Sequence, residues 1–177
     1  LICTPASNVF GIKLPVRRIA ALCKYYGALF CIDAAQTAGM VDIDIQDIGA
    51  DFIAAPGHKG LYGPMGTGFL LINSPAFPQT LYQGGTGMSD PEFNEPFVLP
   101  EKFEAGTVNL SGFCGLSEGI DFVNSKTINK ISKYEFNLIK HLYFSLSSIK
   151  SVKLYTGEPD EKYNIGLLSF NIDDIDC

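Results

Sequence analysis

Residues 51–72 read DFIAAPGHKGLYGPMGTGFLLI, and this stretch decides the fold. Two apolar runs, Phe52–Ala55 and Gly68–Ile72, flank a glycine-rich segment, and apolar runs without alternation are typical of strands covered on both faces. Within the segment, Lys59 has small neighbours that let another group approach closely. Such a pair of His58 and Lys59 is often a solvated turn, but a bound anion or aldehyde would also explain it.

The preceding residues read as a strand, a helix and a second strand. Leu1–Cys3 is a short apolar run that ends in turn-forming residues around Asn8. Pro15 opens a helix over Val16–Tyr26, which Gly27 ends, and Ala28–Ile32 is again apolar. This length fits a βαβ unit with parallel strands. We therefore expect an α/β protein with Asn8 and Asp33 at strand ends.

Asp33 is followed by Ala34, Ala35 and Gln36. In open α/β sheets, ligands bind at the carboxyl edge of the strands. An isolated Asp here would more often cap a turn. The combination of Asp33, a small Ala35, the amide of Gln36 and a downstream Lys59 favours one shared binding site.

The remainder of the chain changes character. Residues 73–107 are rich in proline and predict irregular structure, which in a long loop is often functional. Helical periodicity follows over Leu116–Val123 and Ile128–Leu146. Val152–Tyr155 and Gly166–Ile172 predict strands of a different layer.

Composition excludes several classes of protein. The 177 residues are 46% hydrophobic and 18% charged, with a net charge of −6 and scattered basic residues, so we expect a globular protein that binds neither nucleic acid nor membranes. We see no apolar run long enough to span a bilayer and no signal peptide, and we expect a cytoplasmic protein. Five widely spaced cysteines predict neither disulfides nor a metal site.

Five motifs together resemble the ordered signatures of class V aminotransferase-fold enzymes, which depend on pyridoxal 5′-phosphate (PLP), and are most similar to those of cysteine desulfurases. They are SNVFGIKLP (7–15), CIDAAQTAG (31–39), the opening stretch (51–72), GGTG (84–87) and KFEAGTVN (102–109). The resemblance covers residues 1–123. It implies the fold-type I PLP-dependent transferase fold, with part of a large-domain α/β/α sheet and the start of a small α+β domain.

The resemblance also implies roles for individual residues. Lys59 would hold PLP as a Schiff base, and Asp33 would pair with the protonated ring nitrogen. The other cofactor-binding residues would be Ala35 under the ring, Gln36 at the ring hydroxyl, His58 at the phosphate, Asn8 near the ring hydroxyl and the substrate carboxylate, and Thr86 at the partner subunit's cofactor phosphate. Many relatives have Ser where Pro56 stands, so the phosphate must rely on other groups.

The implied function is that of a PLP-dependent cysteine desulfurase acting on L-cysteine, as a homodimer, with a possible sulfur-acceptor protein. We expect a fragment: residues 1–125 of the PLP-binding large domain, a connecting helix over 126–150 and the incomplete small domain over 151–177. The nucleophilic cysteine and the substrate-binding arginine would lie outside it, and the fragment alone would be inactive. Cys177, beside acidic residues that disfavour a thiolate, is not assigned as the nucleophile.

Two alternatives stay open. Another enzyme of the same fold, such as an aminotransferase, an epimerase or a selenocysteine lyase, would keep Asp33, Gln36 and Lys59. A non-catalytic α/β binding module would have a glycine loop that merely turns, and it predicts that Lys59 and Asp33 do not converge on one place.

Overall fold

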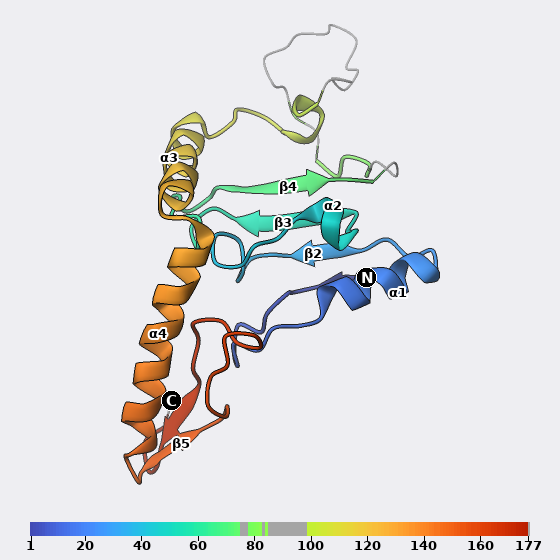
Figure 1. Cartoon of the computed structure of the whole chain (residues 1–177). Coiled ribbons are helices and arrows are strands. Elements are labelled where there is room, and N and C mark those ends of the chain that lie inside the picture. The colour runs from blue at the N-terminus through green and yellow to red at the C-terminus, as the bar shows by residue number, and fades with distance from the viewer. Residues whose placement is uncertain (75–77, 83, 85–98, 177) are drawn as a thin grey trace, which may run out of the picture.

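The computed structural model describes residues 1–74, 78–82, 84 and 99–176. It contains a four-stranded sheet near the N-terminus and a two-stranded sheet near the C-terminus, which two consecutive helices connect (Figure 1). The predicted α/β class is confirmed. Within the described residues, no helix combines the length and the apolar character needed to cross a membrane.

The first sheet has the order β1 (Ile2–Cys3), β2 (Cys31–Asp33), β3 (Phe52–Pro56), β4 (Gly68–Ile72). The first three strands are parallel, in the register Cys3–Ile32–Ile53, and β4 is antiparallel to β3. The carboxyl ends of β1, β2 and β3 therefore meet at one edge of the sheet. The predicted βαβ unit is present, because α1 (Val16–Tyr25) connects β1 to β2.

The core lies between this sheet and its covering helices. Phe30, Ile32 and Ile53 are almost fully buried, and Ala20 and Cys23 of α1 pack against them. Burying such side chains stabilises a fold by roughly 1.5–3 kcal/mol for each large one. The helix ends where expected, since Gly27 adopts a φ of 63°, a conformation that glycine accepts without strain.

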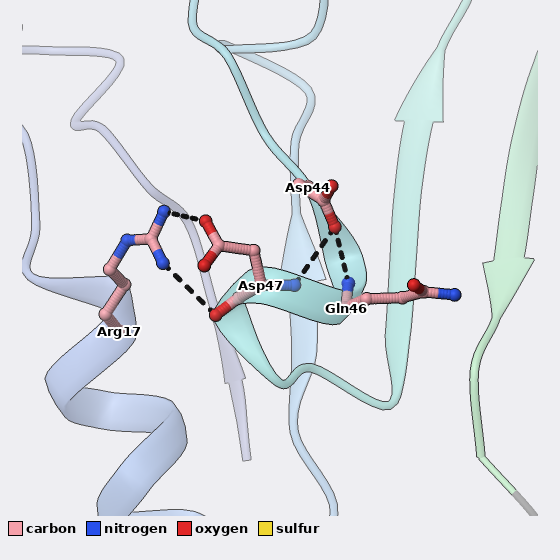
Figure 2. A network of polar contacts seen from close by, with 4 residues as sticks. All are labelled: Arg17, Asp44, Gln46 and Asp47. Atoms are coloured by element: carbon pink, nitrogen blue, oxygen red, sulfur yellow. Dashed lines mark hydrogen bonds and ion pairs between the residues drawn. The ribbon is translucent and has the colours of Figure 1, made fainter.

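A short helix, α2 (Ile45–Ile48), was not predicted. Asp44 caps it by accepting hydrogen bonds from the amides of Gln46 and Asp47, at 2.8 and 3.0 Å. Arg17 of α1 pairs with the Asp47 side chain and donates to the Asp47 carbonyl (Figure 2). The short helix is thus tied to α1 and brings Ile48 into the core.

After the 3₁₀ helix η1 (Glu101–Phe103), two long helices follow: α3 (Leu110–Lys126) and α4 (Ile128–Ser147). Figure 1 shows α4 running from the first sheet to the second one, formed by antiparallel β5 (Val152–Leu154) and β6 (Phe170–Ile172). The helix predicted over Ile128–Leu146 was nearly right in extent. Phe136 and Ile139 are buried, whereas Leu138 is 54% exposed.

Three predicted boundaries were wrong. The strand predicted over Ala28–Ile32 is Cys31–Asp33, because the Phe30 amide donates to the Asp51 carboxylate rather than to a strand. The helix predicted over Leu116–Val123 begins earlier, at Leu110, where Asn109 caps it. The strand predicted over Gly166–Ile172 is only Phe170–Ile172, since the backbone near Ile165 bonds to a loop near the N-terminus.

Candidate active site

Three segments with polar side chains leave the same edge of the first sheet. Asn8 follows β1, Asp33 is the last residue of β2, and His58 and Lys59 follow β3. Because β1, β2 and β3 are parallel neighbours, these segments lie side by side at the carboxyl edge. This edge is where open α/β sheets bind ligands.

The turn after β2 presents a carboxylate to solvent. Asp33 pairs with Ala54 in the sheet, and its Oδ1 accepts a hydrogen bond of 3.0 Å from the amide of Ala35. Oδ1 therefore caps the turn, which is the role that an isolated Asp after a strand usually has. No hydrogen bond to Oδ2 occurs among the described residues. Ala35 and Gln36 are half-buried beside it.

Cys31 lies in the same strand as Asp33. Burial, and then the negative charge of Asp33, raise the pKa of the Cys31 thiol. The thiol therefore stays protonated at neutral pH and is a poor nucleophile.

The segment after β3 holds Lys59 in a closed loop. The amide of Gly57 donates to the Thr67 carbonyl at 2.7 Å, and the amide of Gly63 donates to the Gly57 carbonyl at 2.8 Å. The carbonyl of Lys59 itself accepts from the Tyr62 amide at 2.9 Å. The backbone is thus hydrogen-bonded within the loop, while the side chains of His58 and Lys59 are exposed.

The loops after β2 and β3 touch through two glycines. A Cβ on Gly39 would lie 2.0 Å from the Gly60 carbonyl oxygen, and a Cβ on Gly60 would lie 2.3 Å from the Ala38 carbonyl oxygen. Real Cβ atoms do not approach so closely, so only glycine fits at either place. The turn that begins at Asp33 and the loop that carries Lys59 are therefore packed backbone to backbone.

Gly39 was missed by the sequence reasoning. It closes the motif CIDAAQTAG, and its φ of 80° is a conformation that glycine favours. A glycine a few residues after the strand-end Asp is a usable signal for a turn. The neighbouring strand, however, determines what the turn packs against, and the sequence around Gly39 alone does not predict this contact.

Asn8 lies on an exposed loop, and among the described residues its side chain makes no hydrogen bond to Asp33 or Lys59. The Ser7 hydroxyl accepts hydrogen bonds from the amides of Val9 and Phe10, at 3.2 and 3.1 Å, which forms the turn around Asn8. The next residues wall a shallow pocket of 450 Å³ shared with the second sheet, lined by Val9, Phe10, Tyr155, Leu168, Ser169, Phe170 and Asn171.

Two sequence predictions fall outside the described residues: Thr86, expected at a subunit interface, and Cys177. In the KFEAGTVN motif, Glu104 and Thr107 are exposed. A Cβ on Gly84 would lie 2.9 Å from the amide nitrogen of Gly106, so the backbones of the GGTG and KFEAGTVN motifs meet at these two residues.

The sequence model of the family described as aminotransferase class-V matches residues 1–177. The chain belongs to this family. Among curated proteins of similar sequence, a "Probable cysteine desulfurase" from Methanothermobacter thermautotrophicus is 40% identical over 179 residues, which is 98% of this chain and 44% of that protein. A cysteine desulfurase from Escherichia coli is 33% identical over 96% of this chain and 42% of its own length.

Solved structures of cysteine desulfurases have the same fold as this chain. A cysteine desulfurase from Thermococcus onnurineus superposes with a TM-score of 0.86 at 34% identity, covering 98% of this chain and 44% of that one. One from Escherichia coli has a TM-score of 0.86 at 26% identity. The predicted fold-type I architecture is confirmed, and the chain spans less than half the length of the relatives it matches.

Proposed function

We propose that the protein acts as a PLP-dependent cysteine desulfurase with Lys59 as the lysine that holds the cofactor. One observation supports this most: the loops that carry Asp33 and Lys59 leave adjacent parallel strands and pack backbone to backbone at Gly39 and Gly60. The names of the similar proteins support the choice of substrate.

The residues at this edge fit PLP by their chemistry. The cofactor offers an aldehyde, a protonated ring nitrogen and a phosphate, and the edge offers the exposed amine of Lys59, the exposed carboxylate of Asp33 and the imidazole of His58. The Oδ2 of Asp33, which accepts no hydrogen bond among the described residues, is suited to a cationic ring nitrogen. Ala35 adds no bulk where a flat ring must pack.

PLP, when bound, supplies an electron sink that stabilises negative charge on the substrate Cα. In our proposal, the Lys59 amine holds the cofactor and later moves the α-proton. The Asp33 carboxylate keeps the ring nitrogen protonated. Gln36 and Asn8 bind the ring hydroxyl, and Asn8 also orients the substrate carboxylate.

The overall reaction transfers the sulfur atom of L-cysteine to an enzyme thiol. L-Cysteine and the thiol give L-alanine and an enzyme persulfide, so that no external oxidant or reductant is needed.

We further propose that residues 1–125 belong to the large domain, that residues 126–150 form the connecting helix, and that residues 151–177 begin the small domain. A homodimer, in which Thr86 reaches the partner's cofactor, and a cytoplasmic location complete the proposal.

The test uses the protein at its full natural length, because this chain spans under half of its relatives. After incubation with PLP and reduction with borohydride, peptide mapping should find the phosphopyridoxyl group on Lys59. The variant Lys59→Ala should lose the label and the visible absorbance of the bound cofactor. Lys130→Ala, which removes an exposed lysine from α4, should keep both. A label on another lysine, or an unchanged spectrum in Lys59→Ala, would refute the assignment.

The substrate is tested with the same preparation. Wild-type protein given L-cysteine should release alanine and form a persulfide, which a thiol reductant discharges as sulfide. If the cofactor is trapped on Lys59 but no alanine forms, another amino acid is the substrate. Transamination, epimerisation or selenocysteine cleavage would then be measured instead.

A further inference from the structure

The helix α3 packs against the loop that carries Lys59, and it does so along one face. Three glycines and a leucine at helical spacing make up this face: Gly112, Gly115, Leu116 and Gly119. Gly112 lies against Asn109 and Thr67, and the partners of the other three belong to residues 57–64 of the loop. Leu116 is 6% exposed and its side chain contacts Gly57 and Gly63. The whole Lys59 loop therefore rests on α3.

Gly119 makes the closest contact of this face. A Cβ at this position would lie 2.2 Å from the Leu61 carbonyl oxygen, 3.0 Å from the Tyr62 carbonyl carbon and 3.1 Å from the Gly63 amide nitrogen. All three are backbone atoms, which cannot rotate away as the end of a side chain can. Only glycine lets α3 approach the loop to this distance.

A second contact holds the loop at Gly60, the residue before Leu61. Gly60 lies against the backbone of Ala38 and Gly39, as described above, and Leu61 lies against Gly119. Lys59 immediately precedes these two contacts, and its carbonyl is fixed by the Tyr62 amide. The backbone next to Lys59 is thus fixed by two close contacts and one hydrogen bond.

We infer that Gly119 is a positioning residue for Lys59, which sets where the lysine side chain starts relative to Asp33. This inference rests on the proposed function, because it assumes that Lys59 holds PLP. The reaction of an amine with a bound aldehyde depends on alignment, and a shift of about 1 Å can cost on the order of a hundredfold in rate. A methyl group at residue 119 would force a shift of α3 or of the loop.

The test compares Gly119→Ala with Gly115→Ala in the full-length protein. Both add one methyl group to the same helix and raise helix propensity equally. Among the described residues, however, a Cβ on Gly115 meets only ring carbons of the Pro64 side chain, at 3.1 and 3.2 Å. The measured quantities are the fraction of Lys59 trapped by borohydride at limiting PLP, the pH profile of the bound cofactor's absorbance, and the thermal unfolding midpoint.

Gly119→Ala is expected to lower the PLP affinity by roughly tenfold or more and to shift the pH profile, while Gly115→Ala stays close to wild type. A second variant covers the case in which Gly119→Ala does not fold. Leu116→Val removes one carbon from the side chain that contacts Gly57 and Gly63 and moves its branch point to Cβ, so it loosens the same loop without adding volume. It should shift the pH profile in the same direction by a smaller amount.

The two proposals fail in different ways. In the first case, wild-type protein traps PLP on Lys59, but Gly119→Ala matches Gly115→Ala in trapping and pH profile. Leu116→Val takes the place of Gly119→Ala in this comparison if Gly119→Ala does not fold. The positioning role is then overturned and the proposed function stands. If wild-type protein shows no trapping on Lys59, both proposals fall.

Discussion

Glu135 of α4 is a half-buried carboxyl group, and its environment predicts how stability changes with pH. Burial raises its pKa above the ordinary value. Part of this burial comes from Gly166, where an added Cβ would lie 3.0 Å from the Glu135 Cβ. The folded protein thus binds a proton more tightly at Glu135 than the unfolded chain does. Stability therefore falls as the pH rises from the pKa of Glu135 in the unfolded chain through its raised pKa in the folded protein.

Replacing Glu135 by Gln removes the charge that burial disfavours. We expect Glu135→Gln to be more stable than wild type at neutral pH, with the difference disappearing below about pH 4, where the unfolded carboxyl is also protonated. Urea unfolding between pH 3 and pH 8 measures this. Glu118→Gln, at an exposed position of α3, is the control. A Glu135→Gln variant that is less stable than wild type at neutral pH would contradict the argument.

At the scale of single residues, the sequence indicates which side chains carry chemistry better than it indicates which residues contact one another. Lys59 and Asp33 stand out because their neighbours are unusual: glycines around a lysine, and a carboxylate directly after a buried strand. Gly119 gives no such signal. Its importance comes from Leu61, which is far away in the sequence, and only the packing of α3 on the loop brings them together.

The element α2 shows how one side chain can define a helix of only four residues. Asp44 accepts both amide hydrogen bonds at its start (Figure 2). Asp44→Ala should lower the free energy of unfolding by about 1 kcal/mol, the usual cost of losing such a cap. Asp42→Ala, an exposed change just before the cap, should stay within about 0.5 kcal/mol of wild type. Denaturant unfolding of both variants at neutral pH measures the difference, and equal losses would argue against the cap.

Long elements were predicted well and short or polar ones poorly. Periodicity located α1 and α4 because their apolar residues recur along many turns. It missed α2, which is too short to show a period, and the first turns of α3, whose inward residues are glycines rather than large apolar side chains. The cap at Asn109, which accepts a hydrogen bond from Gly112, was the available signal for the true start.

At the scale of the whole molecule, the loop around Asn8 is bonded to the segment before β6. The Lys13 amide donates to the Tyr163 carbonyl at 2.7 Å, and the Ile165 amide donates to the Gly11 carbonyl at 2.8 Å. The Lys13 ammonium also donates to the Glu161 carbonyl at 2.8 Å. No local pattern predicts this contact, because each partner is ordinary loop sequence.

Gly11 is the residue on which this contact depends most. A Cβ there would lie 2.7 Å from the Leu167 carbonyl oxygen, and its φ is 65°. Gly11→Ala should therefore speed hydrogen exchange at the amides of Lys13 and Ile165 and lower stability by more than the roughly 1–2 kcal/mol expected from a positive φ alone. Gly27 has a similar φ of 63°, and no atom of the described residues lies within 4 Å of an added Cβ, so Gly27→Ala isolates the backbone strain. Equal effects of the two changes would show that the contact contributes nothing.

The bond between Lys13 and Glu161 spans 148 residues of sequence, and this separation has a consequence for assembly. Contacts between distant residues form slowly, because a long loop must close before they contribute any stability. During synthesis the N-terminal part of a chain emerges first. The loop around Asn8 must therefore wait for residues 160–169 to leave the ribosome, so the edge of the first sheet is completed late, after the sheet itself can form.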